Sequence, residues 1–235
     1  MITLYQYYPA LGLRSASPFC IKLETWLRIV GLDYQVECLL HAGRAPKKKL
    51  PFIKHNGSVV ADSTLIIDYL KQAFGCDPDK GLSDRDRGVG TAVMRMLEEH
   101  YYWTVVYSRW IDDKHWPVVK KAYFEKAPLV IRLLIPSLAR RQVRRDLWGQ
   151  GLGRHTVEDI ERLGAEDVMA LSRILADKSY MLGEFATTVD AVAYAFIVST
   201  LVPGLDSLQR RTMQDCANLC AYHERMTMQY FSKDA

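Results

Sequence analysis

The sequence of 235 residues predicts an α/β domain followed by an all-α domain. Strand-like and helix-like patterns alternate over the first 75 residues, whereas the rest of the chain is almost entirely helical in its hydrophobic period. A short segment rich in turn-forming residues lies between these parts. We therefore expect one domain at residues 1–75, a linker at residues 76–87 and a second domain at residues 88–235.

The first part of the chain has the element order βαβ-ββα. The Asn56-Gly57 pair between its last two strands favours a two-residue hairpin turn. The runs that predict its elements are strands at residues 2–8 and 34–40 with a helix at 18–30 between them, then strands at 50–54 and 58–61 and a helix at 63–74. This order places one parallel crossover before one antiparallel hairpin.

The second part of the chain is predicted to consist of helices. The run at residues 191–205 is apolar and uncharged, but it is shorter than the roughly 20 residues that a membrane-spanning helix needs, so we expect a buried helix there. The expected helices are a long one from about residue 89 to 113, one after Pro117, one after Thr156, one after Thr187 and a last one from about residue 213 to 230.

Composition excludes several classes of protein. A hydrophobic content of 49% with 25% charged residues indicates a folded chain, not a disordered one. The formal net charge of +4 is too small to indicate nucleic-acid binding. The five cysteines form no CxxC pair, so we expect no metal site and a reducing, cytoplasmic location. The first residues lack the pattern of a signal peptide, and no transmembrane segment is expected.

Residues 17–20 read Ser-Pro-Phe-Cys and open the first predicted helix. Ser17 suits the N-cap position, and Pro18 suits the first helical position, where its missing N–H costs nothing. Taken alone, this pattern predicts a well-formed helix start. It also resembles the CPxC redox motif of the glutaredoxin and thioredoxin-like fold with the first cysteine replaced by serine. The order βαβ-ββα agrees with a thioredoxin-like domain.

Two further segments resemble the glutathione transferases. Lys49, Leu50 and Pro51 resemble the segment in which the proline is cis and the preceding backbone pairs with the cysteinyl part of glutathione. Asp62 and Ser63 resemble the acidic-serine pair that opens the next helix. A helix N-terminus offers backbone N–H groups to an anion, here the γ-glutamyl carboxylate. The resemblance therefore implies glutathione binding by these five residues, with a cis bond between Leu50 and Pro51.

The second part of the chain carries the same resemblance. Thr187 and Asp190 form a capping box before an apolar run, as in the all-helical domain of glutathione transferases. The amino-acid sequences of the Ser17, Lys49 and Asp62 motifs resemble the branch of failed axon connections and metaxin-related proteins. Residues 153–155 and 218–231 carry the same resemblance. The resemblance implies a homodimer. It also leaves open a transferase-like interaction module without turnover.

Three hydroxyls are candidates for activating the glutathione thiol, whose unperturbed pKa is about 8.5. Ser17 ranks first, because a hydroxyl at a helix N-terminus can donate to a thiolate that the helix dipole also stabilises. Tyr7 ranks second and Ser15 third. Cys20, one turn into the helix, has two interpretations: a packed, inert thiol, or a thiol that forms a mixed disulfide with glutathione.

The remaining candidates lie in the second part. The long helix is dense in aromatic residues, and the transferase architecture implies that some, including Tyr102 and Trp103, line a pocket for a small hydrophobic electrophile. A local basic cluster predicts either a solvated helix face, a docking patch for an anionic partner or a lid over an anionic ligand. Its members are Arg140, Arg141, Arg144 and Arg145.

Overall fold

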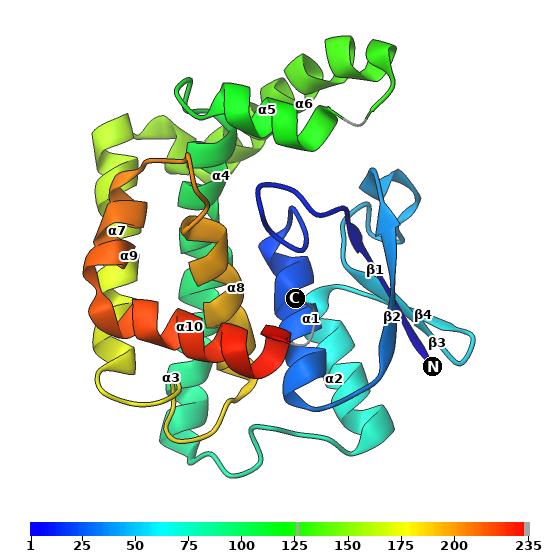
Figure 1. Cartoon of the computed structure of the whole chain (residues 1–235), viewed down its shortest axis with the longest axis vertical. Coiled ribbons are helices and arrows are strands. Elements are labelled where there is room, and N and C mark those ends of the chain that lie inside the picture. The colour runs from blue at the N-terminus through cyan, green and yellow to red at the C-terminus, as the bar shows by residue number, and fades with distance from the viewer. Residues whose placement is uncertain (126, 233–235) are drawn as a thin grey trace.

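The computed structural model describes residues 1–125 and 127–232. Its first domain contains a four-stranded sheet of order β2-β1-β3-β4, in which β1 runs parallel to β2 and antiparallel to β3. The strands are β1 (Ile2–Tyr7), β2 (Tyr34–Leu39), β3 (Phe52–His55) and β4 (Ser58–Ala61). Figure 1 shows α1 (Pro18–Ile29) and α2 (Ser63–Phe74) on one face of this sheet, between it and the helical domain. The predicted order βαβ-ββα is confirmed.

Local sequence explains the turns of this domain. Asn56 and Gly57 both have positive φ angles, as the predicted two-residue hairpin turn requires. Gly75 adopts the left-handed conformation that ends α2. The peptide bond between Leu50 and Pro51 is cis, as expected from the resemblance. It lies directly before β3, whose first residue pairs with the last residue of β4.

The second domain is helical, and its helices surround α8. Every residue of α8 except Val198 is buried, which confirms the predicted buried helix. The capping box of Thr187 and Asp190 opens it, as predicted. The helices are α3 (Asp84–Arg95), α4 (Tyr102–Trp110), α5 (Trp116–Phe124), α6 (Leu129–Gln150), α7 (Val157–Leu175), α8 (Thr188–Thr200), α9 (Leu208–Asp215) and α10 (Ala217–Phe231), with a π-helical turn at Met96–Tyr101 and 3-10 turns at Ala42–Arg44 and Leu152–Arg154.

The helical domain differs from the prediction in three places. Two helices, α5 and α6, lie where one was expected after Pro117. Helix α3 begins at Asp84, inside the segment predicted as linker, because the Ser83 hydroxyl accepts a hydrogen bond from the Asp86 amide and caps the helix. The predicted last helix is two helices, α9 and α10. They separate at Cys216, whose ψ of 89° lies outside the helical region. In the described part of the chain, no helix is both long enough and apolar enough to cross a membrane.

Buried polar contacts join the two domains. Lys22 of α1 and Glu98 of the π-helical turn form an ion pair of 2.5 Å, and both side chains are almost fully buried. The Lys22 ammonium also donates to the Thr64 hydroxyl of α2. The Trp26 indole donates across the domain boundary to Thr188 at the start of α8. These contacts fix α1 against the helical domain, and α1 carries the Ser17 motif at its first turn.

Candidate functional site

A cavity of about 420 Å³ lies between the two domains, at the N-terminal end of α1. One wall comes from the sheet domain, where β1 ends, α1 begins and β2 runs into the 3-10 turn. The other wall comes from α4, α5 and α6. The lining residues used below are Tyr7, Ser17, Tyr102, Arg109, Tyr123 and Ala139.

Ser17 stands in the cavity wall at the start of α1. Its backbone has the extended conformation of an N-cap, and Pro18 follows at the first helical position, as predicted. The Ser17 side chain makes no capping hydrogen bond. The hydroxyl lies at the positive end of the helix, where it is close enough to the Cys20 thiol to lower the pKa of that thiol.

Tyr7 lies at the end of β1 and lines the same cavity. Burial raises the pKa of its phenol to about 12, and the neighbouring thiol of Cys20 and phenol of Tyr102 act in the same direction. Tyr7 therefore keeps its proton at neutral pH and can donate a hydrogen bond. The structure brings Tyr7 and Ser17 together as rival donors.

Cys20 does not line the cavity, although we considered it as a reactive group. Its side chain is fully buried, and burial raises the pKa of its thiol to about 11. The Tyr7 backbone and the hydroxyls of Ser15 and Ser17 lower that pKa, but burial outweighs them. Cys20 packs against Leu50 in a small core beneath the site. The packed position agrees with the inert alternative, and Ser15, also fully buried, lies beneath the cavity surface.

The residues expected to hold glutathione form a strip beside the cavity. Because Phe52 pairs with Ala61, the Leu50-Pro51 and Asp62-Ser63 segments leave the β3-β4 hairpin side by side. In the described part of the chain, the backbone N–H and C=O of Leu50 and the N–H and hydroxyl of Ser63 have no hydrogen-bond partner. These groups are free to bind a peptide backbone and a carboxylate.

Asp62, which is expected to bind glutathione, also caps a helix. Its carboxylate accepts hydrogen bonds from the amides of Thr64 and Leu65, so it caps α2. Its φ of 88° is unusual for a residue other than glycine. Lys49 is exposed just before the cis bond and makes no hydrogen bond within the described residues.

The far wall of the cavity is one face of α4. Five residues of α4 lie on this face because they recur at helical spacing. They are Tyr102, Val105, Val106, Arg109 and Trp110. Burial raises the pKa of Tyr102 to about 12, so this phenol also stays neutral.

Trp103, also expected to line a substrate pocket, does not line this cavity. A helix turns by about 100° per residue, so Trp103 lies to one side of Tyr102, and the two ring centroids are 5.2 Å apart. It packs with Leu147 and Ile160 in a separate core.

Arg109 lies under the cavity wall and is 4% exposed. Its guanidinium donates to the carbonyls of Ala16 and Ser199 and to the phenol oxygen of Tyr123. No carboxylate of the described residues lies within ion-pair distance of it, and its Nε is buried without a partner. Arg109 thus holds the residue before Ser17 in place and orients Tyr123, whose own proton is left to donate elsewhere.

Sequence reasoning did not assign a role to Arg109 or Tyr123. The helical spacing of Arg109 from Tyr102 could have placed both on one face. No sequence signal places Tyr123 of α5 in the cavity, because tertiary packing decides which helix lies beside α4. No group of metal-ligating side chains occurs within residues 1–125 and 127–232.

The chain is similar to proteins of one family. Residues 18–115 match the family model described as glutathione S-transferase N-terminal domain, and residues 164–226 match glutathione S-transferase, C-terminal domain. The isoprene-epoxide–glutathione S-transferase of Rhodococcus sp. (strain AD45) is 32% identical over 98% of this chain and 99% of its own length.

Two other relatives carry different names. Failed axon connections of Drosophila melanogaster is 34% identical over 96% of this chain, which spans 57% of that protein. Metaxin-1 of Macaca fascicularis is 28% identical over 95% of this chain and 73% of its own length.

Solved structures show the same fold at low identity. The β-etherase LigF of Sphingobium sp. strain SYK-6 has a TM-score of 0.67 at 19% identity and matches 96% of this chain and 94% of its own. A glutathione S-transferase III in apo form has a TM-score of 0.60 at 16% identity and matches 96% of this chain and 91% of its own.

Proposed function

Because the chain belongs to the glutathione S-transferase family, we propose that it binds glutathione and activates its thiol for attack on a small hydrophobic electrophile. The observation that carries this proposal is the Ser17 hydroxyl, which lines the cavity at a helix N-terminus and makes no capping bond. A helix start built only for stability would use that hydroxyl as its cap.

Glutathione is proposed to lie along the strip beside the cavity. Its γ-glutamyl carboxylate would accept hydrogen bonds from the Ser63 amide and hydroxyl at the N-terminus of α2. The backbone of its cysteine would pair with the free N–H and C=O of Leu50. Lys49 supplies a positive charge close by. The thiol then points into the cavity toward Ser17.

The chemical step begins when the thiol loses its proton to solvent. Ser17 donates a hydrogen bond to the resulting thiolate, and the dipole of α1 stabilises the same charge. The sulfur then attacks an electrophilic carbon and forms a carbon–sulfur bond while the bond to the leaving group breaks. Tyr7 is the second candidate donor, since its phenol stays protonated.

The electrophile is proposed to be a small apolar epoxide. The aromatic and aliphatic lining of the cavity suits an apolar molecule, and one 32%-identical relative is named for isoprene epoxide. When the thiolate opens an epoxide, the carbon–oxygen bond breaks and the oxygen gains a negative charge and then a proton. The Tyr123 hydroxyl, held by Arg109, faces the cavity as a donor for that oxygen.

A conjugation assay tests this function. The full chain is mixed with glutathione and a small alkene epoxide, and the loss of free thiol is compared with the spontaneous rate. We expect a protein-dependent rate that saturates in both substrates. A rate equal to the spontaneous one for epoxides and for aryl halides alike would contradict the enzyme proposal.

A non-catalytic interaction module is the second candidate. The similarity to metaxin-1 and to Failed axon connections favours it, because those relatives are not named as transferases. Glutathione binding without turnover of any electrophile would support this alternative.

The family resemblance favours a homodimer, and the unpaired cysteine spacing favours a reducing compartment. We propose a homodimer in the cytoplasm, with glutathione as co-substrate and neither a metal nor a nucleic acid as partner. Light scattering of the full chain would test the dimer, and a monomer at all concentrations would contradict it.

A further inference from the structure

The first half of α6 exposes a dense group of large apolar side chains. Five of them are between 60 and 68% exposed, and two more are about 40% exposed. They are Leu129, Val130, Leu133, Leu134 and Leu138, with Ile131 and Ile135. Pro136 is the one buried residue in this half of the helix. Apolar patches of this kind mark interaction sites on soluble proteins.

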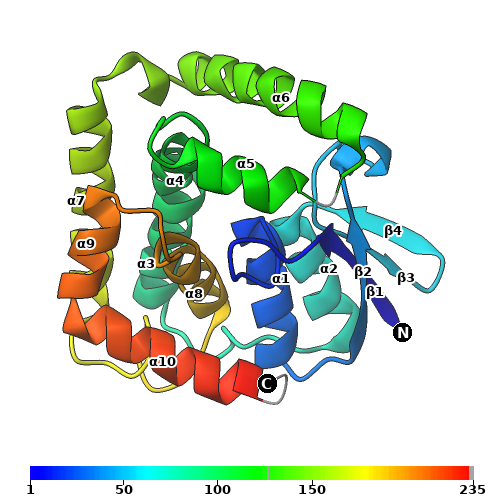
Figure 2. The same cartoon turned by 45° about the horizontal axis from the view of Figure 1, so that its top comes forward.

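These side chains surround the helix instead of forming one stripe. Successive residues point about 100° apart, so three neighbours such as Val130, Ile131 and the exposed Arg132 cover most of the circumference. Figures 1 and 2 show α6 along the outer edge of the molecule, with its N-terminal end reaching toward the sheet domain. Helices α4 and α5 contact α6, but the apolar side chains named above stay exposed.

The charge of this segment has a single sign. Residues 126–145 contain one lysine and five arginines and no aspartate or glutamate. Arg140 has a structural role, because it donates to the carbonyls of Trp110 and Ile111 and pairs with Asp113.

The other three arginines of the cluster differ from Arg140. Arg141, Arg144 and Arg145 are exposed, and none has an ion-pair or hydrogen-bond partner within residues 1–125 and 127–232. Three cations therefore stand one to two turns beyond the apolar half of the helix, free to meet an external anion.

We propose that α6 docks on a membrane surface that contains anionic lipid. Its apolar half inserts among the headgroups, and the three free arginines contact lipid phosphates. Exposed apolar side chains and basic side chains are the two features by which a surface helix binds a membrane interface. Attraction of basic side chains to an anionic surface adds to the burial of the apolar ones.

Two other occupants fit the observations less well. A second copy of the chain would bring the same arginines near one another, and α6 carries a single acidic residue, Asp146, to pair them. A groove on an acidic protein would cover one face of the helix, but the exposed side chains lie all around it. A fluid, negatively charged surface accommodates both the circumference and the charge.

Vesicle co-sedimentation of the full chain tests this proposal. One set of vesicles is pure phosphatidylcholine, and the other contains about a third phosphatidylglycerol. We expect binding to the anionic vesicles that weakens as salt is raised. The double variant Arg144→Gln with Arg145→Gln should lower the partition coefficient about 25-fold, at about fivefold for each arginine. The double variant Leu133→Gln with Leu134→Gln should lower the partition coefficient at least tenfold, which corresponds to the free energy of burying about one leucine side chain.

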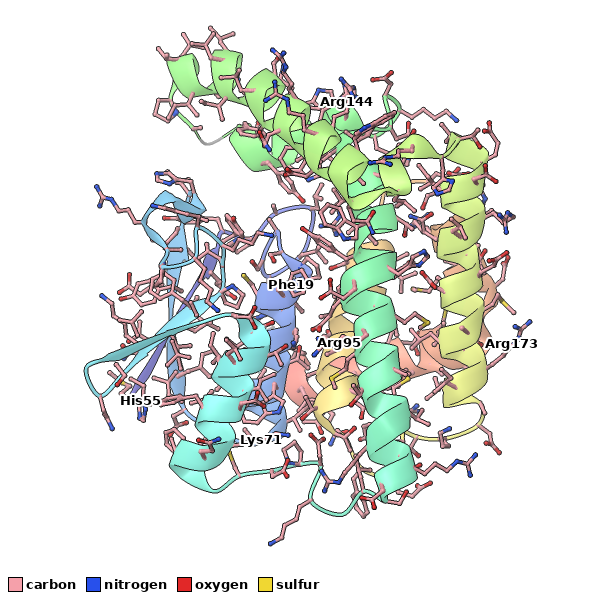
Figure 3. All side chains as sticks on the ribbon, turned by 180° about the vertical axis from the view of Figure 1, so that it is seen from behind. Phe19, His55, Lys71, Arg95, Arg144 and Arg173 are labelled. Atoms are coloured by element: carbon pink, nitrogen blue, oxygen red, sulfur yellow. The ribbon has the colours of Figure 1, made fainter. Side chains whose placement is uncertain are left out.

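Matched variants separate docking from general damage. Arg173→Gln removes an exposed arginine from α7, a different helix (Figure 3), and Met228→Gln removes an exposed apolar side chain from α10. Both should bind vesicles as the wild type does, and thermal unfolding should show that all variants fold. Three outcomes would overturn the proposal: no binding to anionic vesicles, equal binding to neutral ones, or self-association that the Leu133→Gln, Leu134→Gln variant abolishes in the absence of lipid.

Discussion

Ser17 is the residue on which the proposed chemistry depends. It has a hydroxyl that the helix does not use, an extended backbone and a place in the cavity wall. Tyr7 is its rival, because its phenol is neutral and lines the same cavity. The two can be told apart, because removing the true donor raises the pKa of the bound glutathione thiol and removing the other does not.

The Ser17→Ala variant should therefore lower the rate of conjugation about tenfold to a hundredfold at neutral pH, by the loss of one hydrogen bond to the thiolate. The loss should shrink as the pH rises, because more of the thiol is then ionised without help. The pH dependence of kcat/KM checks this. A variant that keeps the wild-type profile, while Tyr7→Phe shifts it, would transfer the role to Tyr7.

Cys20 affects stability at alkaline pH. Its pKa of about 11 in the folded protein lies above that of a thiol in the unfolded chain. The unfolded state therefore loses its proton first, so the contribution of this group to stability is complete below about pH 8.5 and falls as the pH rises toward 11. Below about pH 8.5 both states keep the proton, so stability does not change with the ionisation of this thiol there.

The Cys20→Ala variant should be less stable than the wild type at pH 7, by about 1 kcal/mol for the loss of one buried side chain. Between about pH 8.5 and 11 the wild type should lose up to about 3 kcal/mol that the variant keeps. Urea denaturation across this range measures the difference. Parallel pH dependence in the two proteins would contradict the buried thiol.

At the scale of elements, α1 is held through Lys22 by contacts from two others. The Lys22–Glu98 ion pair links it to the π-helical turn, and Thr64 of α2 also contacts Lys22. A buried ion pair gains little over apolar residues of the same size, but an unpaired buried charge costs several kcal/mol. This asymmetry makes the contact testable.

Replacing Lys22 by Met should destabilise the protein by about 3–5 kcal/mol, because Glu98 would keep its charge without its closest partner. The double variant Lys22→Met with Glu98→Leu should recover most of that loss. Chemical denaturation of the three proteins gives the comparison. Additive losses in the double variant would show that the pair is not coupled.

Arg109 connects α4 to two other parts of the site. Arg109→Leu removes charged hydrogen bonds to the carbonyls of Ala16 and Ser199 and should cost about 3 kcal/mol of stability. Arg109→Lys keeps the charge, but a lysine cannot reach both carbonyls as the forked guanidinium does. The stability of this variant should therefore lie between that of the wild type and that of Arg109→Leu. Denaturation midpoints check the order, with Arg173→Leu as a surface control. Equal denaturation midpoints for the wild type and Arg109→Leu would show that Arg109 does not stabilise the contact between these parts.

Sequence pattern predicts where helices and strands lie better than it predicts which elements pack against one another. The period of the apolar residues located α2 and α8, and the Asn56-Gly57 pair located the hairpin, because these signals are local. Tyr102 could be placed in the pocket but Trp103 could not be excluded from it, because the side that a helix presents depends on its partner. The break at Cys216 has no proline or glycine to announce it.

At the scale of the whole molecule, the domain pair builds the site. The sheet domain supplies the free donors of Leu50 and Ser63 and the Ser17 hydroxyl, and the helical domain supplies the apolar wall. The central claim is that this arrangement binds glutathione, whether or not turnover follows.

Calorimetric titration of the full chain with reduced glutathione tests that claim most directly. We expect saturable binding at or below millimolar concentration, weakened about tenfold by Ser63→Ala and unchanged by Ser58→Ala, an exposed serine on β4. No binding at millimolar glutathione, or equal binding by both variants and the wild type, would contradict the proposed site.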